Sequence, residues 1–144
     1  MNLDEKLRWK FAYKGDFHQK FEDMSKAIQD LDDLIASGVF DFECQKRFFK
    51  SFKKLFDGAI KTLMHYFRYQ GIFQVDSFEI IKEAFYVEII EEGQTWVNML
   101  FDVNEWAKNN YEKLDIKDRL KIKEEYLPEL EKLDKFLAEE CEAV

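Results

Sequence analysis

Residues 42–71, FECQKRFFKSFKKLFDGAIKTLMHYFRYQG, form the longest uninterrupted helical pattern in the sequence. Apolar side chains recur there every three or four positions, which places them on one stripe of an α-helix. Asp41 is expected to cap the first turn, and Gly71 to end the helix in a left-handed conformation. A stripe of this length has to be buried by other helices, so the segment predicts a helical bundle. The stripe consists of Phe48, Phe52, Leu55, Phe56, Ala59, Ile60, Leu63, Tyr66 and Phe67.

The opposite face of this segment is basic, although the whole chain has a formal net charge of −8. Two interpretations of this basic stripe remain open. It is either an ordinary solvated helix face or a docking surface for an acidic partner. The basic stripe consists of Lys46, Arg47, Lys50, Lys53, Lys54 and Lys61.

Composition favours one all-helical domain. A chain of 144 residues has the length of a single domain, so residues 1–144 are expected to fold as one unit. Hydrophobic residues make up 47% of the chain, and 15 residues are Phe, which is enough for a core of large rings. Only five Gly and one Pro interrupt the chain, and this favours long helices.

The chain carries signs of a cytoplasmic protein. Cys44 and Cys141 are too few and too far apart for a zinc site or a disulfide framework, which favours a reducing compartment. The first ten residues are charged and lack the apolar centre of a signal peptide. No stretch approaches the roughly 20 apolar residues of a membrane-spanning helix. The acidic net charge disfavours nucleic acid and anionic membranes as partners.

Four further helices are expected around residues 42–71. The first helical region runs from about residue 4 to residue 35, and an interruption at Gly15 and Asp16 makes it either two pieces or one bent helix, of which the part from about residue 17 is the better defined. A short helix is expected to start at Ser77, its N-cap, and to be followed at residues 87–90 by a segment that is not a strand. The next helix follows a turn at residues 91–93, carries an apolar stripe from Trp96 to Trp106 and weakens at Asn109 and Asn110. The last covers residues 116 to about 140. The expected fold is an antiparallel up-down four-helix bundle with one additional short helix.

The last of these helices has two expected local features. Asp115 is expected to be its N-cap. Pro128 lies inside the helix and removes one backbone hydrogen bond, so a kink is expected near residues 124–126. Its apolar stripe is expected to consist of Leu120, Ile122, Tyr126, Leu127, Leu130, Leu133, Phe136 and Leu137.

Most familiar catalytic patterns are missing from the sequence. The only histidines are His18 and His65, and no glycine-rich phosphate loop or Glu-x-x-His pair occurs. One polar cluster lies at residues 102–111, DVNEWAKNNY, where Asn104 and Lys108 are one helical turn apart. Such a cluster either holds a base or a phosphate, or is simply a polar helix end.

Four short segments, in this order, resemble one family of helical proteins. They read KTLxxYxxYQGI at residues 61–72, SFEIIKEAF at 77–85, IEEGQTWVNML at 90–100 and EYLPxL at 125–130. The third is similar to the family pattern IDDGxxWxxML, and the second to a segment that begins Ser-Pro and ends Ala-Phe. The family is that of the nucleotidyltransferase substrate-binding proteins, within the wider HEPN group of small helical bundles. The resemblance covers about residues 17–137.

This resemblance implies a four-helix bundle that dimerises and pairs with a separate, small nucleotidyltransferase chain. That chain would carry the metal-dependent chemistry, so nucleotide and divalent metal are expected there, and no cofactor or metal ligand is expected in this chain. Some relatives are toxins of toxin–antitoxin pairs, in which an Arg and a His form a ribonuclease site. Their nucleotidyltransferase silences them by adding AMP to a nearby Tyr.

The sequence departs from the ribonuclease pattern Asp-Arg-Asn-x-x-x-His. Asp102 and Asn104 match it, whereas Val103 replaces the Arg and Lys108 replaces the His. Val cannot stabilise a phosphoryl anion, and Lys at its usual pKa is a poor general base near neutral pH. Tyr111 lies one position beyond the family's tyrosine.

The other departures lie in the two preceding helices. Asp57 matches an acidic position of the family, whereas Lys53 stands where another acid is common. Phe78 replaces the proline that often follows the serine of the second segment.

The sequence therefore predicts a non-catalytic substrate- or nucleotide-binding subunit of a two-chain nucleotidyltransferase. Two alternatives remain: a HEPN-type ribonuclease toxin with a rearranged site, and a structural or regulatory dimer whose basic stripe binds an acidic protein. No catalytic residue is assigned. The predicted substrate cleft is lined by Asp57 and Lys61 from one helix, which face Asp102, Asn104, Lys108 and Tyr111 from another.

Overall fold

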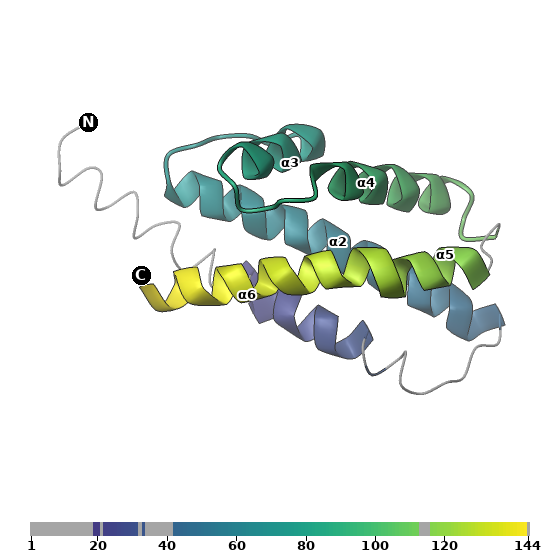
Figure 1. The fold of residues 1–144 in the computed structure, drawn as a ribbon. Coiled ribbons are helices and arrows are strands. Elements are labelled where there is room, and N and C mark those ends of the chain that lie inside the picture. The colour runs from purple at the N-terminus through teal and green to yellow at the C-terminus, as the bar shows by residue number, and fades with distance from the viewer. Residues whose placement is uncertain (1–18, 21, 32, 34–41, 113–115, 144) are drawn as a thin grey trace, which may run out of the picture.

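The computed structural model describes residues 19–20, 22–31, 33, 42–112 and 116–143 (Figure 1). No strand occurs among them, so the predicted all-α class is confirmed. The expected N-caps Asp41 and Asp115, the break at Gly15, and His18 lie outside the described residues. The elements are an N-terminal helical segment within residues 19–33, α2 (Phe42–Tyr69), α3 (Ser77–Tyr86), α4 (Gly93–Lys108), α5 (Ile116–Lys121), a π-helical turn η1 (Ile122–Tyr126) and α6 (Leu127–Ala143).

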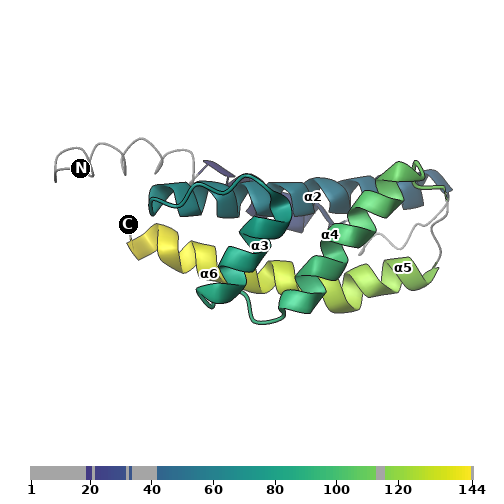
Figure 2. The same ribbon diagram turned by 90° about the horizontal axis from the view of Figure 1, so that it is seen from above.

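The aromatic stripe of α2 forms the centre of the core, as predicted. Its members are between 0% and 7% exposed. The ring of Phe49 lies 5.1 Å from that of Trp106 in α4, and Phe52 stacks on Tyr126 in η1 at 6.0 Å. Tyr66 meets Phe136 of α6 at 6.0 Å. Figures 1 and 2 show the result: α2 runs the length of the molecule between α4 on one side and α6 on another.

The end of α2 is set by Gly71, also as predicted. Gly71 has a φ of 92°, a conformation that L side chains adopt at a cost. The Ile72 N–H donates to the carbonyl of Phe67 at 2.8 Å, and the Gly71 N–H to that of Arg68 at 3.0 Å. These are the two bonds of a Schellman closure, which satisfies the last carbonyls of the helix.

The start of α3 differs from the prediction by one residue. Asp76, rather than Ser77, is the N-cap, because its carboxylate accepts from the Glu79 N–H at 3.2 Å. Residues 87–90 form a turn and not a strand, as expected. Glu88 has a φ of 63° there, and the Ile89 N–H donates to the Ala84 carbonyl at 2.9 Å. This is a second Schellman closure, made without glycine.

The expected kink before Pro128 takes the form of the π-turn η1. The Leu127 N–H donates to the carbonyl of Ile122, five residues earlier. Pro128 has no N–H to continue the regular pattern, which accounts for a wider turn at this place. Leu120 was predicted to lie on the buried stripe and is 44% exposed, so that assignment is wrong.

Two side-chain hydrogen bonds hold the N-terminal helical segment against the bundle. The hydroxyl of buried Thr62 lies 3.1 Å from the Lys20 carbonyl and 2.7 Å from that of Gly58. Ser25 donates to Asp134 of α6 at 2.6 Å. The segment is therefore fixed to both α2 and α6.

Replacing Thr62 by valine is expected to lower the free energy of unfolding by about 1 kcal/mol, because the hydroxyl that the Gly58 and Lys20 carbonyls share as a donor is lost while the side-chain volume is kept. Urea unfolding followed by circular dichroism measures the change. Thr95→Val, at a half-buried position of α4, is the control and should change stability by less than about 0.5 kcal/mol. Equal midpoints for wild type and Thr62→Val would contradict this role for the hydroxyl.

Candidate functional site

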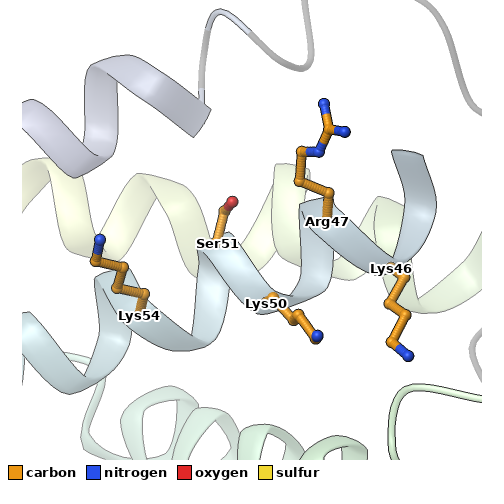
Figure 3. A pocket seen from close by; sticks show the side chains of 5 residues that line it. All are labelled: Lys46, Arg47, Lys50, Ser51 and Lys54. Atoms are coloured by element: carbon orange, nitrogen blue, oxygen red, sulfur yellow. The ribbon is translucent and has the colours of Figure 1, made fainter. Parts of the chain in front are cut away.

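The N-terminal half of α2 carries a hollow lined almost entirely by cations. Its volume is about 460 Å³, and Figure 3 shows the side chains around it. Arg47, Ser51 and Lys54 extend to the side of α2 on which the N-terminal helical segment lies, whereas Lys46 and Lys50 extend to the opposite side. The lining consists of Lys46, Arg47, Lys50, Ser51 and Lys54.

A larger groove of about 740 Å³ runs between the N-terminal helical segment and α2. Six lysines and three aspartates line it, so its surface is positive in a chain that is negative as a whole. It shares Lys50, Ser51 and Lys54 with the hollow, and the two form one continuous basic surface. The charged residues of the groove are Lys20, Lys26, Lys50, Lys53, Lys54, Lys61, Asp23, Asp30 and Asp57.

Gly58 gives the groove part of its depth. It lies in the middle of α2, where glycine costs roughly 1 kcal/mol relative to alanine. A Cβ atom at this position would meet no atom within 4 Å, so it would project into open space. The glycine is thus not required by packing and leaves free volume along the groove.

Two of the six predicted site residues, Asp57 and Lys61, lie in this groove. Asp57 forms an ion pair with Lys53 at 2.5 Å, one turn earlier on α2. Because both partners are partly exposed, the pair is screened by water and positions the two side chains more than it stabilises the fold. Lys61 is exposed and available to a ligand.

Tyr111 is brought to the border of the same surface. The Lys50 Nζ lies 6.0 Å from the centroid of its ring. Burial raises the pKa of the Tyr111 hydroxyl above its ordinary value of 10.0, the nearby Lys53 ammonium lowers it, and Asp57 raises it. Tyr111 therefore lies close enough to Lys53 and Asp57 to feel their charges, at the edge of the basic surface.

The backbone that places Tyr111 is unusual. Asn110 and Tyr111 have φ angles of 52° and 60°, and consecutive left-handed residues other than glycine carry strain. The Tyr111 N–H donates to the Trp106 carbonyl at 2.9 Å, and the Asn110 N–H to that of Ala107 at 3.0 Å. This third Schellman closure ends α4 and turns the ring toward α2.

Asp102 is engaged elsewhere. It accepts a hydrogen bond from the Tyr126 hydroxyl and pairs with Lys121 at 3.0 Å. Burial, followed by this bond to Asp102, raises the pKa of Tyr126 well above its ordinary value. The Lys121 ammonium also lies 5.6 Å from the ring centroid of Tyr126. Asp102 therefore connects α4 to the last helical region and does not line the groove.

Asn104 and Lys108 are exposed and lie on the other flank of α4. Residues two apart on an α-helix are separated by about 200° around its axis, so Asp102 and Asn104 point to opposite sides. Lys108 stands in the same relation to buried Trp106. The six predicted residues do not converge: Asp57, Lys61 and Tyr111 share one basic surface, and Asp102 belongs to another contact.

The residues that the sequence analysis missed come from the N-terminal helical segment. Lys20, Asp23, Lys26 and Asp30 form one wall of the groove. Their spacing of three or four along a helix was a usable signal, because it places them on one charged face. The spacing alone does not predict that this face packs beside α2.

The described residues contain neither a metal-binding group nor a membrane-spanning helix. No group of three or more His, Cys, Asp or Glu side chains is placed to hold a metal ion there. Within the same part of the chain, no helix is both long enough and apolar enough to cross a membrane.

The comparisons with known proteins bear on the same part of the chain. A family model described as "Nucleotidyltransferase substrate binding protein like" matches residues 19–139. No significant match was found among curated proteins. The matched region includes the N-terminal helical segment, α2 and Tyr111, and so covers the whole basic groove. The chain belongs to the family of nucleotidyltransferase substrate binding protein like chains.

Proposed function

We propose that this chain is a non-catalytic, substrate-binding subunit that pairs with a separate small nucleotidyltransferase chain. The observation that carries the proposal is the groove between the N-terminal helical segment and α2, where lysines outnumber aspartates. A surface of this charge attracts phosphate-bearing ligands, since ammonium groups bind phosphate oxygens as point charges. The family to which the chain belongs is named for the binding of such an enzyme's substrate.

The proposal assigns binding of the substrate to this chain and the metal-dependent chemistry to the partner. The groove offers lysines and aspartates as binding groups, and the Tyr111 ring lies near Lys50 at its border. Nucleotide transfer needs a metal that bridges phosphate oxygens, and the partner chain would supply it. The contacts of Asp102 with Tyr126 and Lys121 support this role over the ribonuclease alternative. Asp102 is the acidic residue of the ribonuclease pattern, and here its carboxylate is already bound by these two side chains.

The proposal includes three finer features that go with the family resemblance. These are the antiparallel up-down arrangement of four HEPN-like helices, a homodimeric state and a cytoplasmic location. Multi-angle light scattering of the purified chain distinguishes a monomer from a dimer.

The first requirement of this function is association. The chain and the nucleotidyltransferase encoded beside it, each purified separately, should form one complex on size-exclusion chromatography at micromolar concentration. Two separate peaks at that concentration would contradict the subunit role.

The second requirement is that the groove holds the phosphate-bearing ligand. Gly58→Leu is expected to weaken binding of ATP to this chain alone, without the nucleotidyltransferase, at least about tenfold, because the side chain projects into the groove without a clash at Cβ. Isothermal titration calorimetry measures the affinity. Gly58→Ala is the matched control: it should keep binding and stabilise α2 by up to about 1 kcal/mol. Unchanged affinity in Gly58→Leu would show that the ligand binds elsewhere.

A further inference from the structure

Exposed hydrophobic side chains are concentrated in and around α3. Eight large hydrophobic side chains of the described residues are exposed, and six of them fall between residues 73 and 87. Clustered apolar exposure of this kind marks an interaction site more often than chance, whereas single exposed residues do not. The six form what we call the α3 patch: Phe73, Val75, Phe78, Phe85, Tyr86 and Val87.

The helix that carries the α3 patch is apolar on two sides. Ile80, Ile81 and Ala84 face the core and are at most 2% exposed. Phe78 and Phe85, seven residues apart, lie on one outward flank, because seven residues make nearly two full turns. A helix that is hydrophobic on both sides is normally covered on both. Figure 2 shows α3 on the near side of the molecule, and no other helix among the described residues lies in front of it.

The C-terminal end of the patch is fixed by packing and by hydrogen bonds. The Phe85 ring rests against the start of α4, where a Cβ on Gly93 would come within 3.0 Å of it. The turn after α3 is fixed by the Glu88 N–H bond to the Phe85 carbonyl at 3.1 Å and by its positive φ. Rigid aromatic side chains lose little entropy when a partner covers them, which suits them to anchor an interface.

The residues that flank the patch in the sequence are mostly acidic, and we refer to them as its rim. Six carboxylates and one lysine lie between residues 73 and 93: Asp76, Glu79, Glu83, Glu88, Glu91, Glu92 and Lys82. A second copy related by a two-fold axis would set one acidic rim against the other, which is unfavourable. An anionic membrane would be repelled for the same reason. The rim instead matches a protein whose apolar contact surface is bordered by Lys and Arg.

We infer that the α3 patch is the surface on which the nucleotidyltransferase chain docks, through an apolar centre with a basic border. This inference rests on the proposed function, since it names where the partner of that function binds. The patch shares no residue with the basic groove, so docking there leaves the groove open to substrate.

The test measures the affinity of the purified nucleotidyltransferase chain for variants of this chain by biolayer interferometry. Phe78→Ala and Tyr86→Ala are each expected to raise Kd at least about tenfold, as central aromatic residues of interfaces do. The double variant Glu91→Lys, Glu92→Lys is expected to slow association by about tenfold at low salt, with a smaller effect at high salt. Leu120→Ala, an equally exposed apolar residue in α5, is the matched control and should bind as wild type does.

The possible outcomes separate this inference from the proposed function. If wild type binds the nucleotidyltransferase and the patch variants bind equally well, the docking surface is elsewhere and the inference is wrong, while the subunit role stands. If the patch variants keep that affinity but lose self-association on light scattering, a second copy covers the patch, which also overturns the inference. If wild type does not bind the nucleotidyltransferase, the proposed function fails and the inference with it. Circular dichroism confirms that each variant is folded.

Discussion

Replacing Phe52 by alanine is expected to lower the free energy of unfolding by about 3–5 kcal/mol, the largest effect of any single substitution considered for this chain. Phe52 is fully buried at the middle of α2. Its ring stacks on Tyr126 at 6.0 Å and meets Trp106 edge-on at 6.3 Å. Phe52 thus contacts both α4 and the π-turn η1. Its removal leaves a cavity between these two elements and α2.

Urea unfolding monitored by tryptophan fluorescence measures this loss, and Trp106 lies next to the expected cavity. Lys54→Ala is the control, because Lys54 is exposed only two residues along the same helix. It should shift stability by no more than about 0.5 kcal/mol. A cost below about 1 kcal/mol for Phe52→Ala would mean that the site collapses around the smaller side chain and that this ring is not central to the core.

Stability is expected to fall steeply above about pH 10, and Tyr126 is expected to cause much of that fall. Burial and the bond to Asp102 raise the pKa of Tyr126 in the folded chain, and unfolding returns it to about 10.0. Below pH 10 the hydroxyl is protonated in both states, so it gives no pH dependence. Above pH 10 the unfolded chain loses the proton and the folded chain keeps it. The free energy of unfolding then decreases by up to about 1.4 kcal/mol per pH unit.

Urea unfolding at pH 8, 10 and 11 tests this expectation. Tyr66 and Tyr111 also have raised pKa values, so wild type should lose stability through more than one group. Tyr126→Phe removes one titrating group, so the free energy of unfolding should fall less steeply with pH than in wild type. The same substitution lowers stability at pH 8, because the hydrogen bond to Asp102 is lost. Equal slopes for wild type and Tyr126→Phe would show that another group titrates over this range.

The sequence was sufficient to predict the core of α2 and its end, because both depend on local rules. Helical spacing decided which face of α2 is buried, and Gly71 is the one residue there that adopts its φ of 92° without strain. The N-cap of α3 was misplaced by one residue because Asp76 and Ser77 are both good capping residues. Leu120 was misassigned because the helical period was assumed to continue unchanged through residues 122–126.

The site was only partly predictable, for reasons that concern distance in the chain. The charges of Asp57 and Lys61 were visible, but the second wall of their groove comes from residues near Lys20, some forty positions earlier. Tyr111 reaches α2 only because Asn110 and Tyr111 itself adopt left-handed conformations, which their residue types do not require. Asp102 was grouped with Asn104 by its place in a motif, whereas the helix places them on opposite sides.

The π-turn also fixes the rotation of α6 about its own axis. A π-turn is in effect a one-residue insertion into an α-helix, and each residue turns the helix by about 100°. Without it, the buried leucines of α6 would be rotated out of phase with Ile122, and the row formed by Leu130, Leu133 and Leu137 would no longer point into the core. Formation of the core therefore requires the right number of residues between Ile122 and Tyr126 as well as the apolar side chains of those leucines.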